Sequence, residues 1–208
     1  MPYNRDVGAT MTTRIATALV TLLIPAAVLA QDPAQLQRLF DAGQFQQVVA
    51  STTPDSPPDA LYLMAQSQQK IGAVDQAAQA YSLIAQRPES DPWHFIGLSG
   101  RQLIEGNAEA AVASARQAAA MAPDLPTAHF QLGLALARVQ NWPEAATAFD
   151  AASERQPGNA YAHYYGGMMH YRANRVDRMA VHFEQFLKLA PEAPERPEVL
   201  SIMKTLRR

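Results

Sequence analysis

A spacing of 34 residues recurs along this chain and constrains its fold more than any other feature. The residues that repeat at this spacing are prolines, small residues and phenylalanines: Pro123, Pro157 and Pro191; Ser99, Gly133 and Gly167; Ala77, Ala111 and Ala145; Phe149 and Phe183. A fixed period of this length is typical of helix pairs stacked into a solenoid. It argues against a globular catalytic domain.

Four full units fit the period, and each is predicted to form two antiparallel helices. The units occupy residues 58–91, 92–125, 126–159 and 160–193. In each unit the second helix follows a predicted tight turn, at Gly72, Gly106, Asn141 and Asn174, because glycine and asparagine tolerate the left-handed backbone that ends a helix. Asp91 before Pro92, and Asn159 before Ala160, are predicted helix caps.

Small side chains in the middle of the predicted helices indicate that the two helices of a unit lie close together. The seventh and eighth places of the units hold Met64 and Ala65, Leu98 and Ser99, Leu132 and Gly133, and Gly166 and Gly167. The facing places on the second helices hold Ala77, Ala111 and Ala145, with Met179 as the exception. Such residues allow axes near the short end of the usual range of about 8 to 10 Å.

The third unit carries the motif of a known family. Leu132, Gly133, Ala145, Phe149, Ala152 and Pro157 stand where the pattern W-x2-L-G-x2-Y, A-x3-F, P requires them, while His129 and Leu136 replace its tryptophan and tyrosine. From Pro58 to Pro191 the chain therefore resembles a tetratricopeptide repeat (TPR) protein. The resemblance implies an all-α fold, a right-handed solenoid of stacked antiparallel helix pairs, whose first helices line a concave binding face.

Residues 1–30 have the features of a bacterial signal peptide. Arg14 precedes the apolar stretch Ile15–Ile24, Pro25 follows it, and small residues favour cleavage after Ala30. The apolar segment is shorter than the ~20 residues of a spanning helix, so an uncleaved anchor is the less favoured alternative. Either Met1 or Met11 serves as the start. We expect an exported protein, periplasmic or secreted, with no stable membrane span after cleavage.

The segments that flank the four units are predicted to cap them. Residues 31–57 are expected to contain a degenerate helix pair around Gly43 and a loop. Residues 194–208 are expected to form a C-terminal capping helix with Val199, Ile202, Met203 and Leu206 on one face. The alternative is that this helix is offered to a partner.

Composition and motifs exclude several functions. A net charge of -2 gives no basic excess for nucleic acid, and the absence of cysteine excludes disulfides and thiolate chemistry. The chain has no nucleotide loop, nucleophile elbow or zinc-protease motif. We therefore expect no enzyme, no catalytic residues, no cofactor and no metal. His129, His163 and His170 could approach one another, but packing is the favoured role for these imidazoles.

In TPR proteins certain positions of each unit line the concave face, and the residues at these positions in this chain indicate a partner with apolar side chains. The predicted groove residues are Tyr62, Trp93, Ile96, Phe130, Leu134, Tyr161, Tyr164, Met168 and Tyr171, with Arg138 and Arg172 near the rim. Tyrosine and tryptophan are common anchors of protein interfaces. The leading hypothesis is a non-catalytic scaffold or adaptor of the cell envelope that binds a peptide or protein segment. The alternatives are a self-assembling structural protein, which leaves the oligomeric state open, and an accessory subunit of an envelope enzyme or of a secretion or assembly complex.

Overall fold

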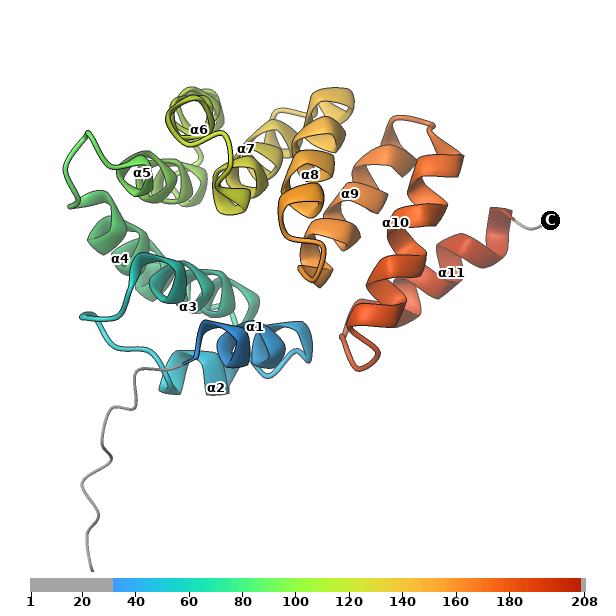
Figure 1. Cartoon of the computed structure of the whole chain (residues 1–208), viewed down its shortest axis with the longest axis horizontal. Helices are drawn as coiled ribbons and strands as arrows, with labels where there is room; N and C mark the ends of the chain where they lie inside the picture. The colour runs from blue at the N-terminus through green and yellow to red at the C-terminus, as the bar shows by residue number, and fades with distance from the viewer. Residues whose placement is uncertain (1–31, 207–208) are drawn as a thin grey trace, which may run out of the picture. The chain divides into compact units, whose positions relative to one another are not determined.

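The first helix of each predicted unit begins where the 34-residue period places it. The computed structural model describes residues 32–206, and 13-residue helices begin there at Pro58, Pro92, Pro126 and Ala160. The helices of the described residues are α1 (Pro33–Asp41), α2 (Phe45–Ala50), α3 (Pro58–Lys70), α4 (Val74–Ala85), α5 (Pro92–Ile104), α6 (Ala108–Met121), α7 (Pro126–Arg138), α8 (Trp142–Arg155), α9 (Ala160–Arg172), α10 (Val176–Leu189) and α11 (Arg196–Leu206) (Figure 1). Residues 32–206 contain no strand, so the predicted all-α class is confirmed.

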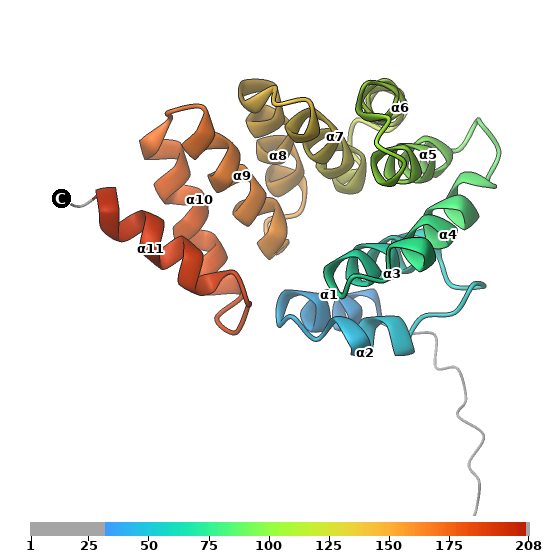
Figure 2. The same cartoon turned by 180° about the vertical axis from the view of Figure 1, so that it is seen from behind.

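Helices that follow one another in the chain pack side by side. The pairs α3/α4, α5/α6, α7/α8 and α9/α10 each pack closely, and each pair also packs against the next, as both views show (Figures 1 and 2). α1 and α2 pack on α3, and α11 packs on α10. The predicted α-solenoid of stacked helix pairs is therefore confirmed.

Turn residues in left-handed backbone mark the start of each second helix. Gly72 and Gly106 have φ angles of 79° and 82°, and Asn174 has 57°. In the third unit the left-handed residue is Gln140, with φ of 60°, and the predicted turn residue Asn141 instead stands at φ of -80° as the residue before α8. The prediction of Asn141 was therefore wrong by one place, because the 34-residue register outweighed the local preference for asparagine.

Glycine in the first helices makes room for aromatic rings on the second helices. A Cβ atom added to Gly133 would lie 2.7 Å from the ring of Phe149, and one added to Gly167 would lie 2.5 Å from the ring of Phe183. Both rings are fully buried. Close approach of the paired helices, which the small residues predicted, thus depends on the missing side chain at these two positions.

The two ends of the helix array contact each other. The rings of Phe40 in α1 and Tyr161 in α9 have centroids 4.8 Å apart and meet edge to face. Lys70 at the end of α3 places its Nζ 2.6 Å from Oε1 of Glu195, just before α11. The other carboxylate oxygen of Glu195 accepts a hydrogen bond of 2.7 Å from the Tyr161 hydroxyl. These contacts join residues far apart in the chain and hold opposite parts of the inner face close together.

The described parts of the two flanking segments contain the helices α1, α2 and α11. Gly43 lies between α1 and α2 at φ of 73°, and Val199 of α11 is fully buried, with Ile202 and Met203 partly buried. The predicted signal peptide, residues 1–30, lies outside the described residues. Among residues 32–206, no helix combines the length and apolarity needed to cross a membrane.

Candidate binding site on the inner face

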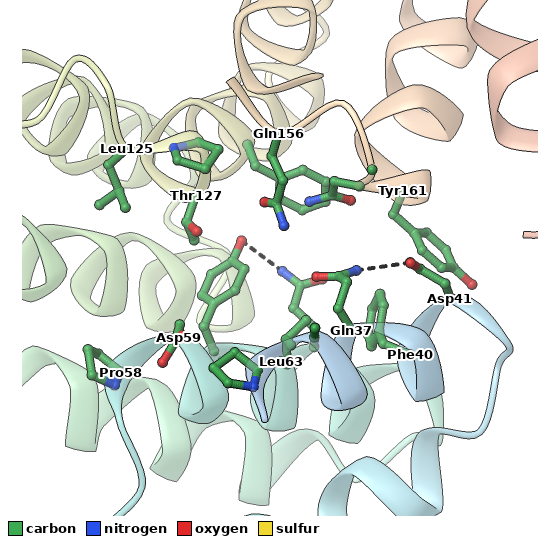
Figure 3. A pocket seen from close by; sticks show the side chains of 18 of the residues that line it. Gln37, Phe40, Asp41, Pro58, Asp59, Leu63, Leu125, Thr127, Gln156 and Tyr161 are labelled. Carbon is green, nitrogen blue, oxygen red and sulfur yellow. Dashed lines mark hydrogen bonds between the residues drawn. The ribbon is translucent and has the colours of Figure 1, made fainter. Parts of the chain in front are cut away.

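The larger hollow of the inner face, here called the first cavity, lies where the first helices begin. It has a volume of about 680 Å³ and is lined by residues of α1, α3, α5, α7 and α9. Aromatic rings of Phe40, Tyr62, Trp93, Phe130 and Tyr161 form much of its wall. Figure 3 shows Gln37 and Asp41 of α1 on one side of this space, and Thr127 and Gln156 on the opposite side. Five helices thus converge on one concave site, which is of the size that binds small ligands or a few peptide side chains.

A second cavity of about 530 Å³ lies toward the other ends of α3, α5 and α7, and α4 and α9 also contribute to its lining. Its lining includes Gln69, Lys70, Leu134 and Arg138, and Gln66 borders both cavities. The ammonium group of Lys70 is already paired with Glu195 and lies 4.8 Å from the Tyr161 ring centroid. The charge of Lys70, a partly buried cation of the second cavity, is therefore already paired within the chain.

A chain of hydrogen bonds separates the two cavities and links three units. The Tyr62 hydroxyl donates to Oε1 of Gln131 at 2.8 Å, and Nε2 of Gln66 donates to Tyr62 at 3.0 Å. Nε2 of Gln131 donates to the Ser99 hydroxyl, which in turn donates to the carbonyl of Ala111. Burial raises the pKa of Tyr62 well above its usual range, so its hydroxyl stays protonated as a donor. Buried polar groups with complete partners fix one arrangement of the inner face.

Asp41 is a buried carboxylate on the wall of the first cavity. Only 8% of the residue is exposed, and its oxygen accepts one hydrogen bond of 2.9 Å from Nε2 of Gln37. Burial raises the pKa of Asp41 to about 7, although the Gln37 bond opposes the shift. The first cavity therefore contains a group that changes charge near neutral pH.

The predicted groove residues divide between the two cavities and the interior. Tyr62, Trp93, Phe130 and Tyr161 line the first cavity, and Leu134 and Arg138 line the second. The other five line neither cavity: Ile96 is fully buried, Tyr164 is buried and donates to Glu198, Met168 is partly buried, and Tyr171 and Arg172 are exposed. That these residues bind a partner remains a prediction. The six that line one of the two cavities are the remaining candidates.

Sequence reasoning missed the contribution of α1 to the site. Gln37, Phe40 and Asp41 all line the first cavity, although their segment was expected only to cap the array. Their sequence carries no local signal for this role, because it depends on α1 meeting α9, more than a hundred residues later.

The histidines of the fourth unit meet an aspartate of the third. Nε2 of His170 and Nε2 of His182 each lie 2.8 Å from Oδ1 of Asp150. The His163 ring lies beside that of His182, with centroids 5.3 Å apart, whereas His129 bonds separately to the carbonyl of Pro123. The group that could hold a metal is thus Asp150, His170 and His182, of which the sequence reasoning had considered only His170.

Comparison with protein families identifies two parts of the chain. Residues 59–90 match a tetratricopeptide repeat model, and residues 130–194 match another model of the same description. No curated protein sequence is similar enough to count as a relative.

Two solved structures similar to this one are described as TPR proteins. TTC0263, a thermophilic TPR protein of Thermus thermophilus, is 20% identical, with a TM-score of 0.59 over 84% of this chain and 98% of that one. YrrB, described as a TPR protein with an unusual peptide-binding site, is 16% identical, with a TM-score of 0.50 over 81% of this chain and 88% of its own. At these identities the likeness concerns the fold.

Proposed function

Because the chain is a tetratricopeptide repeat protein, we propose that it is a non-catalytic scaffold or adaptor that binds a segment of another protein in the first cavity. The observation that carries the proposal is the cavity itself. About 680 Å³ of concave space lies among five helices and is lined by five aromatic rings. Aromatic walls bind apolar side chains without losing much side-chain entropy of their own.

The polar residues of the first cavity suit a peptide backbone. Gln156 lines the same space as the rings, and its amide can both donate and accept hydrogen bonds. Gln37 and Gln66 donate within the chain through Nε2 but keep a carbonyl oxygen that can accept, and Asn159 keeps an NH₂ group that can donate. An extended segment presents a carbonyl and an N–H at every residue, so amide side chains can satisfy it in any register. We therefore propose a partner segment with apolar side chains, bound through the rings and held at its backbone by the amides.

The test blocks the first cavity without removing a core contact. Thr127 lines this cavity and is only partly buried, so Thr127→Trp would place an indole in the space where the segment binds. Peptides selected from a random displayed library against the wild type would be measured by calorimetry. We expect Thr127→Trp to weaken their binding at least about tenfold, since bulk in a desolvated site excludes the ligand.

A matched control variant separates the cavity from the outer surface. Tyr171 was predicted as a groove residue, but it is exposed and lines neither cavity. Tyr171→Ala should leave peptide affinity unchanged. Equal binding by Thr127→Trp and the wild type, or loss of binding in Tyr171→Ala alone, would contradict the first cavity as the binding site.

Self-association is a second candidate function, favoured by apolar side chains on the last two described helices. Val181 of α10 is 58% exposed and Leu200 of α11 is 46% exposed. Isolated exposed residues are common, so the deciding measurement is molar mass in solution across a range of concentrations. A monomer at every concentration would exclude this candidate.

We also propose that the protein is exported across a bacterial inner membrane. The support is the composition of residues 1–30, with Arg14 before an apolar stretch and small residues near Ala30. N-terminal sequencing of protein recovered from a periplasmic fraction would test it. A chain that begins at Gln31 is expected, and a chain that retains the segment in the cytoplasmic fraction would refute export.

A further inference from the structure

Three helices from two units bring two buried imidazoles to one carboxylate. Asp150 is on α8, His170 on α9 and His182 on α10, and the imidazoles are 1% and 6% exposed. From this arrangement we propose that Asp150, His170 and His182 bind one divalent first-row transition-metal ion. The site is separate from both cavities, none of whose lining residues it shares.

The donor set and its spacing suit such an ion. Imidazole nitrogen and carboxylate oxygen are ligands that zinc, iron, cobalt and nickel share, and the three donor atoms lie within 4.8 Å of one another. Two donors at a right angle, each about 2.05 Å from a metal ion, are about 2.9 Å apart. The two separations of 2.8 Å between Nε2 and Oδ1 already match this value. A tetrahedral ion would need them to widen to about 3.3 Å.

The charge on Asp150 is available for a cation. Oδ1 of this carboxylate lies 2.8 Å from Nε2 of both His170 and His182, so the two imidazoles meet at one carboxylate oxygen. The side chain of Asp150 is 19% exposed, so solvent reaches the carboxylate. Arg178 lies 4.0 Å from Oδ2, but its side chain is 67% exposed and can turn away into solvent.

Among the four units, only the fourth has a small residue at its seventh place and a large one at its twenty-third, and this reversal makes room for the cluster. In the other three units the seventh place is large, as Met64, Leu98 and Leu132, and the twenty-third is small, as Ala80, Ser114 and Ala148. The fourth unit reverses both, with Gly166 and His182. A Cβ atom added to Gly166 would lie 2.9 Å from the His182 ring. The imidazole therefore occupies space that the glycine leaves, which directs its Nε2 to Asp150.

The second ring nitrogens limit the affinity of the site. Nδ1 of His170 and Nδ1 of His182 are buried without a hydrogen-bond partner. When Nε2 binds a metal, the ring hydrogen moves to Nδ1, and metal-binding histidines commonly donate that hydrogen to a carbonyl or carboxylate. Without such a partner the site should bind the ion more weakly than sites with a complete outer shell do. We expect a dissociation constant in the micromolar rather than the nanomolar range. The role of the site is to fasten the fourth unit to the third.

The test uses Zn²⁺ with protein that carries no histidine tag. Calorimetry should show one saturable ion per chain, and a hundredfold excess over the dissociation constant should raise Tm by about 5 to 10 °C. Asp150→Asn and His182→Gln should each weaken binding at least about tenfold. His129→Gln, which changes a histidine outside the cluster, should bind as the wild type does.

A second measurement does not depend on the variants folding. In nitrogen spectra of the wild-type imidazoles, Zn²⁺ should shift Nε2 of His170 and His182 and leave His129 unchanged. Absence of saturable binding would overturn the proposal, as would wild-type affinity in folded Asp150→Asn or a shift confined to other histidines. In any of these cases the cluster is a hydrogen-bonded packing element only.

Discussion

The polar contact between the two ends of the array, from Lys70 to Glu195, can be removed by changing one residue. The Glu195 carboxylate accepts hydrogen bonds of 2.6 Å from Lys70 and 2.7 Å from the Tyr161 hydroxyl. The Lys70 and Glu195 side chains are 23% and 13% exposed, so water replaces these bonds only in part. A bond to a charged group contributes about 1.5 to 3 kcal/mol. After allowance for partial exposure, we expect Glu195→Ala to lower the free energy of unfolding by about 2 to 3 kcal/mol.

A double-mutant cycle isolates the ion pair from the rest of the truncation. Urea unfolding of the wild type, Glu195→Ala, Lys70→Met and the double variant should give a coupling energy of about 1.5 kcal/mol. The Glu195→Ala variant should also melt about 5 to 10 °C lower than the wild type. Lys70→Met preserves most of the side-chain volume beside the Tyr161 ring, which the ammonium group approaches to 4.8 Å.

The chain offers a control pair with the same distance and different burial. Arg116 and Glu144 also lie 2.6 Å apart, but their side chains are 54% and 43% exposed. Their coupling in an equivalent cycle should stay below about 0.5 kcal/mol, since exposed ion pairs are screened by water. If the Lys70 and Glu195 cycle gave a coupling as small as the control, the reasoning that burial strengthens this contact would be refuted.

Three further changes test the fold and its titration. Gln140→Gly should raise the free energy of unfolding by about 1 kcal/mol in urea melts, because Gln140 is held at φ of 60°; a loss of stability would contradict this. Gly166→Leu should lower the free energy of unfolding by about 1 to 3 kcal/mol, because the leucine overpacks the His182 ring. Adding His182→Ala should restore most of that stability, and a double variant as unstable as Gly166→Leu would refute the exchange of side-chain volume between the two positions. The folded-state pKa of Asp41 is about 7, whereas its unfolded value is 3.8. The stability that this carboxyl contributes is therefore complete below pH 3.8 and is lost as the pH rises through 7. The free energy of unfolding of Asp41→Asn should therefore exceed that of the wild type by about 4 kcal/mol at pH 8 and by less than about 1 kcal/mol at pH 4. Equal differences at the two pH values would contradict this expectation.

Features that depend on neighbours in the chain could be predicted from the sequence. The period places the starts of α3, α5, α7 and α9, and the caps follow from single residues. The Asp91 side chain accepts from the N–H of Trp93 at 3.0 Å, and the Asn159 side chain accepts from that of Ala162 at 3.1 Å. Helix pairing follows as well, because the small residues that face Phe149 and Phe183 recur at the same period.

Features that depend on the curvature of the array could not be predicted in this way. The 34-residue pattern states which helices are neighbours, but not how far the array turns over four units. Phe40 meets Tyr161, and Lys70 meets Glu195, only because that turn brings α1 and α3 to α9 and the start of α11. The groove was predicted as an open surface, whereas the hydroxyls of Tyr161 and Tyr164 bond to Glu195 and Glu198 of the C-terminal segment, and both residues are buried.

Contact between the ends also changes how a repeat array responds to binding. In an open solenoid each unit touches only its neighbours, so an end unit can unfold without cost to the opposite end. Here α1 and α9 supply facing walls of the first cavity, and unfolding of either removes the contact between Phe40 and Tyr161. A segment bound between these walls adds contacts to both ends at once. It should therefore protect the amides of α1 and α9 together, because any ligand specific for the folded state stabilises the parts that must be in place to bind it.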